Sequence, residues 1–526
     1  MNSSSEKRQS PLDCISDIFR KYISRFDAIV FSSAFVLTFL VHMYMFTHKF
    51  LNHDDIGGLY SEVNLLSSGR WFLHFATGIN GNFSSSWLGA LFGAFYLAVA
   101  AVLILRMLRI RRFVPAVLTV ACLVAFPTVT STYAYMFCAD QYLLALTLSA
   151  AAAYMISREK RSLIILGGVV MAFSMGIYQA YFPLAASLLV MSMLIDAINS
   201  RYTSFKDFII VGLKYVAGLA VGMILYFIIL RICLKVYNVE LVDYQGISSM
   251  GIVSLGELIE RIRAAYLSFS EFYLTSPVFH SFFKYIVIAS FVFNIIALAL
   301  IIKQRGLYKS VAVIAEIVIL LALLPLACGL VYVMAGMLTV HLVMLFPRVL
   351  PLILPAVFAS NIDFDCAGSG PHSVRASGAV CLVLTCALLL SQFACAYEFL
   401  LIDNRAYFDM DLTYENTYAF MTKLTAKIEL QEGFTEDTPI ALIGKVDMGS
   451  VIPQSAMTGV FTGNRAANMY TRPQFLSYFL SSSYIYAGDD TIEQIEKSEE
   501  FKSMPCYPNE GSIKTIDGVI VVKFSD

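Results

Sequence analysis

Long apolar runs separated by short polar segments fill the chain as far as residue 399. A helix needs about 20 mostly apolar residues to cross the hydrocarbon of a bilayer, and eleven runs approach that length. The third to sixth runs are short or interrupted by proline. The pattern predicts eleven transmembrane helices, near residues 27–47, 86–106, 113–133, 140–156, 162–178, 182–198, 208–230, 283–302, 311–334, 340–359 and 378–399.

Lysine and arginine are distributed unevenly over the loops between these runs. No basic residue lies between Arg112 and Arg158 or between Arg161 and Arg201, whereas the alternate loops are rich in them. Because basic loops stay in the cytoplasm, the polar segment 1–26 is predicted to be cytoplasmic and the loop 48–85 to face outward. The first apolar run is too long for a signal-peptide core and has no small-residue cleavage site, so it should remain as the first helix.

The chain changes character after residue 399. An odd number of crossings places residues 400–526 outside the membrane, and they contain no run long enough to span it. Segments 414–430 and 489–501 have helical spacing, and segments 438–444 and 518–524 have the pattern of strands. We predict an all-α polytopic membrane protein whose transmembrane domain, 27–399, is followed by a small extracytoplasmic α+β domain.

The longest loop between two spans contains an amphipathic pattern at about 252–269. Apolar residues from Ile252 to Phe269 recur at spacings of three and four, and charged residues fill the other face. Such a helix is predicted to lie flat in the outer interface with its apolar side in the acyl chains. The alternative is that it packs on the C-terminal domain.

Composition agrees with a membrane protein. Apolar residues make up 58% of the 526 residues and charged residues 14%, against roughly a quarter in soluble proteins. The net charge of -1 gives no reason to expect nucleic-acid binding. The ten cysteines form no CxxC pair and no Cys/His cluster with metal-ligand spacing, so no metal site is predicted.

The first outer loop contains candidate catalytic and anion-binding residues. His53 is followed by Asp54 and Asp55, and Arg70 stands in a Gly-Arg-Trp sequence. Either aspartate could take a proton from a hydroxyl as a general base, and Arg70 could hold an anionic group. The alternative is that the two aspartates only cap or solvate a helix end.

Several other polar residues are predicted at the same depth as this loop. An ionisable group at a helix centre costs about 2.5 to 3.5 kcal/mol on insertion scales, so it should face a cavity or a partner. Glu316 is an exception, nearer the cytoplasmic end and better explained as a helix contact. The residues at the outer level are Asp140 and Gln141, Tyr178 and Gln179, and His341 and Arg348. We predict that the first five of these bind substrate.

Such a set suits a substrate with its tail in the bilayer and its phosphate at the outer interface. Arg70 and Arg348 could neutralise that phosphate, since guanidinium matches phosphate geometry. The cytoplasmic loops contain no GxGxxG, Walker or DxD-type nucleotide motif, which fits a donor that is already carried on lipid.

The motifs together resemble one known family. An acidic pair after the first span, Gly-Arg-Trp some fifteen residues later, Asp140 at the head of a span and the Ser-Met-Gly-Ile-Tyr-Gln turn ending at Gln179 are similar to those of the O-antigen glucosyltransferases of serotype-converting bacteriophages and their bacterial relatives. The segment Arg348-Val-Leu-Pro351, the odd span count and the polar C-terminal domain are similar too.

This resemblance implies a GT-C-type glycosyltransferase in the bacterial cytoplasmic membrane. It would move a glucosyl or other hexosyl unit from a polyprenyl-phosphate-linked donor to a surface polysaccharide such as O-antigen. Asp54 and Asp55 match the acidic pair, and Arg70, Asp140 and Gln179 match their motifs. The resemblance leaves open which aspartate is the base, which sugar is moved, and whether a divalent metal assists.

Two other classes of protein remain compatible with the sequence. A flippase or other transporter of lipid-linked saccharides would also be polytopic, but internal repeats or midplane charges would be expected, and the chain shows no clear repeat. A structural or assembly protein would have no need of an acidic pair beside an arginine in its first outer loop.

Overall fold

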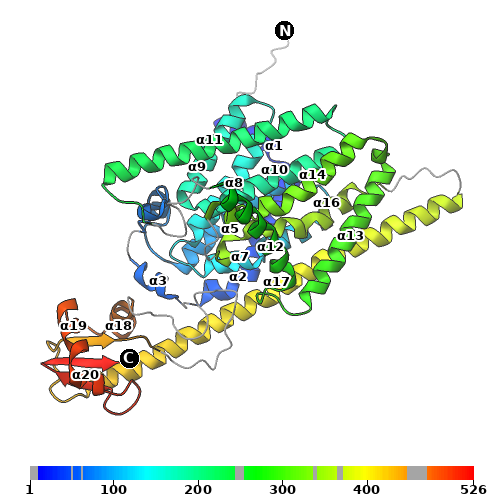
Figure 1. Cartoon of the computed structure of the whole chain (residues 1–526). Helices are drawn as coiled ribbons and strands as arrows, with labels where there is room; N and C mark the ends of the chain where they lie inside the picture. The colour runs from blue at the N-terminus through cyan, green and yellow to red at the C-terminus, as the bar shows by residue number, and fades with distance from the viewer. Residues whose placement is uncertain are drawn as a thin grey trace, which may run out of the picture.

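The structure is a computed structural model, and it describes residues 10–48, 51–60, 63–242, 254–335, 340–363, 371–446 and 471–525. A helical bundle forms most of it, and a small sheet stands at the end of one long helix (Figure 1). Seven helical segments within the described residues are long and apolar enough to cross a membrane. They are α2 (Arg25–Thr47), α5 (Ser86–Met107), Gln179–Ile198 (η3 and α10), α11 (Phe205–Tyr237), α13 (Phe283–Gln304), α14 (Val311–Cys328) and the Gly378–Glu429 part of α17.

Each of the other predicted spans also coincides with helix. The third corresponds to α6 (Phe113–Val124) and α7 (Pro127–Tyr133), which are bent by 44° and count as an eighth span if taken together. The fourth and fifth correspond to α8 (Ala139–Ile156) and α9 (Arg161–Ile177). The mostly helical membrane architecture is therefore confirmed, while the count of eleven spans remains a prediction.

The ninth and tenth predicted spans are broken. After Gly329 the ninth continues as α15 (Leu330–Ala335), and the tenth consists of η6 (Leu342–Met344), η7 (Phe346–Ile353) and α16 (Leu354–Asn361). Pro347 and Pro351 lack the backbone N–H that an α-helix needs, which leaves carbonyl groups to be satisfied from outside. Tyr273 donates to the Arg348 carbonyl at 2.5 Å, and every residue of η7 is buried.

The last helix is much longer than predicted. α17 (Pro371–Glu429) runs without a break through the eleventh predicted span and the separately predicted helix 414–430. The chain has neither glycine nor proline between Gly378 and Gly433, so nothing stops the helix where its composition turns polar. Buried polar contacts fix α17 to the bundle: Thr130 donates to Asp403 at 2.5 Å, and Tyr407 bonds to His42 at 2.7 Å.

The C-terminal unit follows α17 directly (Figure 1). Its sheet has the order β1 (Ile440–Ile443), β3 (Val519–Lys523), β2 (Ile513–Ile516), with β1 parallel and β2 antiparallel to β3. Both predicted strands are present, and β2 and α18 (Arg472–Leu480) were not predicted. The predicted helix 489–501 is divided into α19 (Asp489–Lys497) and α20 (Glu499–Ser503).

The predicted amphipathic helix is α12 (Leu255–Leu274), and Ile252 lies outside the described residues. It packs against α13, α14 and α15 through a face that includes Arg261, Ala265 and Phe272. Leu255 and Ile259 on the predicted apolar stripe are exposed. Apolar side chains that point away from the protein are what contact with lipid requires, so the interfacial position remains our prediction.

At the other end of the chain, α1 (Pro11–Tyr22) lies beside the first turn of α2. The Tyr22 carbonyl accepts from Arg106 Nη2 at 2.6 Å, which ties the end of α1 to the end of α5. The N-terminal segment therefore contains a helix that the sequence analysis did not predict.

Candidate functional site

Arg70 is held by a tight turn between the 3-10 helix η1 (Leu66–Ser68) and the short helix α4 (Leu73–Thr77). Gly69 has φ +78°, a left-handed conformation that favours glycine, and its N–H and that of Arg70 donate to carbonyls of the preceding turn. Trp71 then packs on α9 at Gly176, where an added Cβ would lie 2.6 Å from the indole ring. The turn therefore presents Arg70 from a fixed backbone.

Two of the sequence motifs form a single unit. The Phe72 N–H donates to the Gly176 carbonyl at 2.8 Å, and Gln179 Nε2 donates to the Ser68 carbonyl at 3.1 Å. Tyr226 of α11 closes the connection, because its hydroxyl donates to the Gly69 carbonyl at 3.0 Å and accepts from Gln179 at 2.9 Å. The role of Gln179 in these contacts is to position the Arg70 turn.

The Arg70 guanidinium is framed by two stacked tyrosines. The rings of Tyr142 and Tyr178 are 4.3 Å apart and nearly parallel. Arg70 Nη1 donates to the Tyr142 hydroxyl at 2.8 Å, and its central carbon lies 4.9 Å from the Tyr178 ring centre. Stacking and a hydrogen bond limit the orientations of a guanidinium, which suits it to bind a planar or tetrahedral oxyanion.

The two adjacent aspartates have different environments. They begin the short helix α3 (His53–Gly57), which is capped by Asn52. Asp55 is fully buried: it accepts from Phe137 N at 2.9 Å and from the Asn52 backbone and side chain at 3.2 and 2.8 Å. Burial raises the pKa of Asp55 well above its usual range, although these N–H donors oppose the rise.

Unlike Asp55, Asp54 is partly exposed to solvent. Its side chain is 46% exposed, and one oxygen lies 3.4 Å from His53 Nε2. Of the two carboxylates, only Asp54 has room for a second molecule at hydrogen-bond distance. The alternative interpretation of the pair as a helix cap therefore describes Asp55, which completes a capping box with Asn52.

Asp140 is enclosed beside the same loop. It is 1% exposed and accepts from Asn80 Nδ2 at 3.2 and 3.3 Å and from Gln141 Nε2 at 3.0 Å. Asn80 belongs to η2 (Gly78–Asn80), at the end of the outer loop that also contains Arg70. Asp140 and Gln141 thus fasten that loop to the head of α8.

The turn between α7 and α8 relates these groups to one another. Phe137 in this turn donates to Asp55, while Asp140 and Tyr142 in the first turn of α8 bond to Asn80 and Arg70. The Phe137 ring also packs on α3, where a Cβ at Gly58 would approach it to 2.9 Å. Six of the nine predicted site residues are thereby brought around the turn between α7 and α8, namely Asp54, Asp55, Arg70, Asp140, Gln141 and Tyr178. We call these six residues the Arg70 group; Gln179, the first residue of η3 (Gln179–Tyr181), supports them.

His341 and Arg348 both belong to the broken tenth predicted span. Arg348 is 2% exposed, with Nη2 bonded to Ser268 of α12 at 2.9 Å and its guanidinium 4.8 Å from the Phe272 ring. His341 is half-buried at the start of η6. The helix η6 packs against α7, which leads into the turn that carries the Arg70 group.

A sequence comparison decides the family. The family model described as "Glucosyl transferase GtrII" matches residues 43–352, which include the loop of α3 and Arg70, Tyr178, Gln179 and the segment up to Pro351. The chain belongs to the GtrII glucosyl transferase family. No curated protein matches the chain in a separate sequence comparison.

This membership confirms the resemblance to the O-antigen glucosyltransferase family of serotype-converting phages. It indicates a membrane glycosyltransferase, with a sugar donor and an acceptor as its substrates. The matched residues contain the whole Arg70 group and end before α17, so the C-terminal unit lies outside the part of the chain that the GtrII comparison covers.

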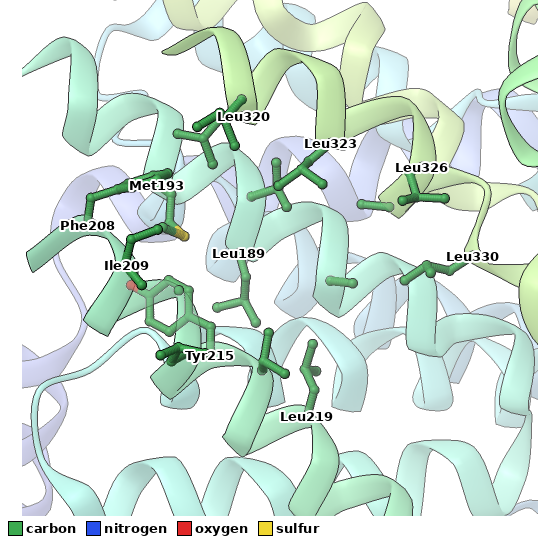
Figure 2. Close-up of a pocket in the computed structure, with 17 residues that line it drawn as sticks. Leu189, Met193, Phe208, Ile209, Tyr215, Leu219, Leu320, Leu323, Leu326 and Leu330 are labelled. Atoms are coloured by element: carbon green, nitrogen blue, oxygen red, sulfur yellow. The ribbon is translucent and has the colours of Figure 1, made fainter. Parts of the chain in front are cut away.

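An apolar groove lies within the part of the chain that the GtrII comparison covers. Its volume is about 400 Å³, and its walls come from α10, α11, α14 and α15. Figure 2 shows Leu320, Leu323 and Leu326 on one side, with Ile209, Tyr215 and Leu219 of α11 on the other. Tyr226, which holds the Arg70 turn, lies about two turns, or about 10 Å, beyond Leu219 on the same helix.

Four residues of this GtrII site were missed by the sequence analysis. Asn52 could have been predicted as a helix cap, because an Asn followed three positions later by an acidic residue resembles a capping box. Asn80 had no such signal, since an asparagine between glycines is typical of an ordinary turn. Tyr142 and Tyr226 had none either, since a tyrosine in an apolar run is as consistent with core packing as with a site. For the metal left open above, the described residues contain no cluster of three or more His, Cys, Asp or Glu with the geometry of a metal site, so we assign no ligands to one.

We expect Asp55→Ala and Asp55→Asn to destabilise the loop that carries α3. Both changes leave buried N–H donors of Phe137 and Asn52 without an acceptor, and each unmade buried hydrogen bond costs about 1–3 kcal/mol. Thermal unfolding of the purified protein and protease cleavage after residue 48 would measure the loss. Asp54→Ala, one position earlier, is the matched control and should leave both unchanged; equal stability of all three variants would contradict the capping role of Asp55.

Proposed function

We propose that the protein transfers a glucosyl or other hexosyl unit from a polyprenyl-phosphate-linked donor to a surface polysaccharide such as O-antigen. The transfer would take place at the outer side of the bacterial cytoplasmic membrane, in a fold of the GT-C type. The observation that carries the proposal is one oriented guanidinium, Arg70, and one accessible carboxylate, Asp54, in a domain whose helix α11 both holds the Arg70 turn and forms a wall of an apolar groove.

The tail and the phosphate of a lipid-linked donor each match a feature of the protein. The groove offers only hydrocarbon, which suits a polyprenyl tail. Arg70, whose orientation Tyr142 and Tyr178 limit, suits the phosphate, whose negative charge increases as the sugar leaves. Asp140 and Gln141 hold the loop in place but are themselves almost fully buried, so we assign them to positioning.

The transfer step follows from these placements. Asp54 accepts the proton of an acceptor hydroxyl, whose oxygen attacks the anomeric carbon of the sugar. The bond from that carbon to the phosphate oxygen breaks, and its electrons leave with the polyprenyl phosphate, which Arg70 stabilises. Asp55 keeps α3 in position, and Arg348, bonded to Ser268 away from this group, supports the packing of α12 against η7.

The orientation proposed for the membrane is also supported by the fold. α18 of the C-terminal unit contacts α3, where Tyr60 and Tyr478 form an edge-on ring pair with centres 5.9 Å apart. α1 lies at the opposite end, beside Arg106. An odd number of crossings would produce this arrangement, with the N-terminus in the cytoplasm and the C-terminal unit outside.

A transfer assay tests the proposal. Purified protein would receive radiolabelled polyprenyl-phosphate-glucose and membrane polysaccharide, with Asp54→Ala as the control. Label should reach the polysaccharide only with the unchanged protein. Label that instead changes leaflet in vesicles without transfer would establish the flippase alternative.

Donor chain length tests the groove separately. Gly212 lines the groove, and a Cβ added there would lie 3.5 Å from Met193 Cε, so Gly212→Phe should fill the space. We expect the KM for a long polyprenyl donor to rise by about tenfold or more, since each buried methylene contributes about 0.8 kcal/mol. A donor with two isoprene units, too short to depend on the groove, should be used equally well by both proteins; an equal rise for both donors would refute the assignment.

A further inference from the structure

A second, basic cavity lies at the end of the bundle opposite α3. Its volume is about 950 Å³, and it is lined by the end of α1, the start of α2, the end of α5 with the turn that follows it, the end of α8, and Arg201. Seven of its lining residues are Arg or Lys, and one, Asp27, is acidic. The lining thus has a large excess of positive charge within a hollow rather than on an open face.

Part of this charge is neutralised within the protein. Arg106 Nε and Nη2 each donate to Asp27 at 2.8 Å, and Arg109 pairs with Asp196. Arg201 lies 3.5 Å from the same Asp196. An adjoining cavity of about 720 Å³ shares several of these arginines but adds three carboxylates, so its excess of positive charge is smaller.

The remaining cations of the first cavity are not neutralised in this way. In the part of the chain that the structure describes, Arg20, Lys21, Arg111 and Arg158 form no salt bridge. The Arg158 guanidinium lies 3.9 Å from the ring centre of Tyr154, which also lines the cavity. Arg109 adopts φ +54°, an uncommon conformation for a residue other than glycine, and its buried Nη1 has no hydrogen-bond partner among the described residues.

The cavity also has an apolar side. Phe26 and Val30 of α2 and Val102 and Leu105 of α5 form its inner wall, where the two helices enter the predicted membrane. A soluble anion would gain nothing from this wall. A ligand with a charged head and hydrocarbon chains would use both the arginines and the apolar residues.

From these features we infer that the cavity binds the phosphate headgroup of an anionic phospholipid of the cytoplasmic leaflet. Guanidinium groups bind phosphate oxygens through paired N–H donors, and basic recesses between helices at this depth attract anionic headgroups. The volume exceeds that of one phosphate and accommodates a glycerophosphate head with the beginning of its chains. This site is independent of the glucosyl transfer at the outer end.

The test uses the full chain, purified in detergent and titrated with phosphatidylglycerol or phosphatidylcholine. Native mass spectrometry would count bound lipid, and thermal unfolding would report stabilisation. We expect phosphatidylglycerol alone to bind and to raise the melting temperature. The double variant Arg111→Gln/Arg158→Gln should bind it about tenfold more weakly or worse, and Arg158→Lys should give an intermediate loss because the paired donors are gone.

Arg112→Gln is the matched control, since Arg112 is exposed in the same turn and does not line the cavity. It should bind phosphatidylglycerol as the unchanged protein does. Unchanged glucosyl transfer by the double variant would show that it folds. Equal binding of the two lipids, equal loss in the Arg112 variant, or displacement of the lipid by glycerol phosphate at the same concentration would each overturn the inference.

Discussion

Asp54→Asn is expected to insert and fold normally yet to transfer sugar about a hundredfold to ten-thousandfold more slowly, the range that general bases contribute. The amide keeps the size of the carboxylate but cannot accept the proton of the acceptor hydroxyl. Because Asp54 is exposed and its only described ion-pair contact is with His53 at 3.4 Å, the change removes no buried hydrogen bond. The measurement is kcat at saturating donor, with unfolding temperature followed in parallel.

Asp54→Glu supplies the matched comparison. It restores a base about one carbon bond out of place, and a partial recovery of kcat is expected. A rate within about threefold of the unchanged protein in Asp54→Asn would remove Asp54 from the role of base, and the buried Asp140 would become the next candidate.

Arg70→Gln is expected to reduce kcat/KM for the lipid-linked donor by about a hundredfold to a thousandfold, as the loss of one donor to a developing negative charge does elsewhere. Arg70→Lys should recover only part of this, since charge is kept but the paired donors are lost. The measurement is a donor titration at fixed acceptor concentration.

Tyr142→Phe tests whether donor use depends on the orientation of the Arg70 guanidinium as well as on its charge. It removes the 2.8 Å hydrogen bond that fixes Arg70 Nη1 but leaves both the guanidinium and the ring stack. A smaller loss than in Arg70→Gln is expected. Arg348→Gln should lower the unfolding temperature instead of donor use; if it raised the donor KM as Arg70→Gln does, the phosphate site would have to include η7.

Hydrophobic runs predict how far along the membrane normal a residue lies, but they do not give its position around the bundle. Arg70 and Arg348 were both expected at the outer level, and yet one lies against α8 and α9 and the other against α12. That position depends on how helices far apart in the sequence pack, which periodicity within one helix does not reveal.

The difference between Asp54 and Asp55 also depends on a contact between distant segments, which the sequence does not reveal. From the sequence, the pair could act either as a general base or as a helix cap. Their separation into an exposed and a buried carboxylate depends on Phe137, which reaches α3 from the distant turn before α8. By contrast, the length of α17 had a sequence signal that our prediction of two separate helices did not use, since an uninterrupted stretch without glycine or proline has no internal reason to end.

Because α17 is unbroken, its length and helical twist fix the distance and rotation of the C-terminal unit relative to the membrane domain. Each residue of an α-helix advances about 1.5 Å and turns about 100°, so the stretch from Phe399 to Glu429 spans about 45 Å. One added residue there would swing α18 away from α3 by more than a quarter turn, whereas seven would return it to nearly the same bearing about 10 Å further out. Because α18 rests on α3, the helix is a spacer of fixed length and direction, and the C-terminal unit cannot rotate away from Asp54 unless α17 bends.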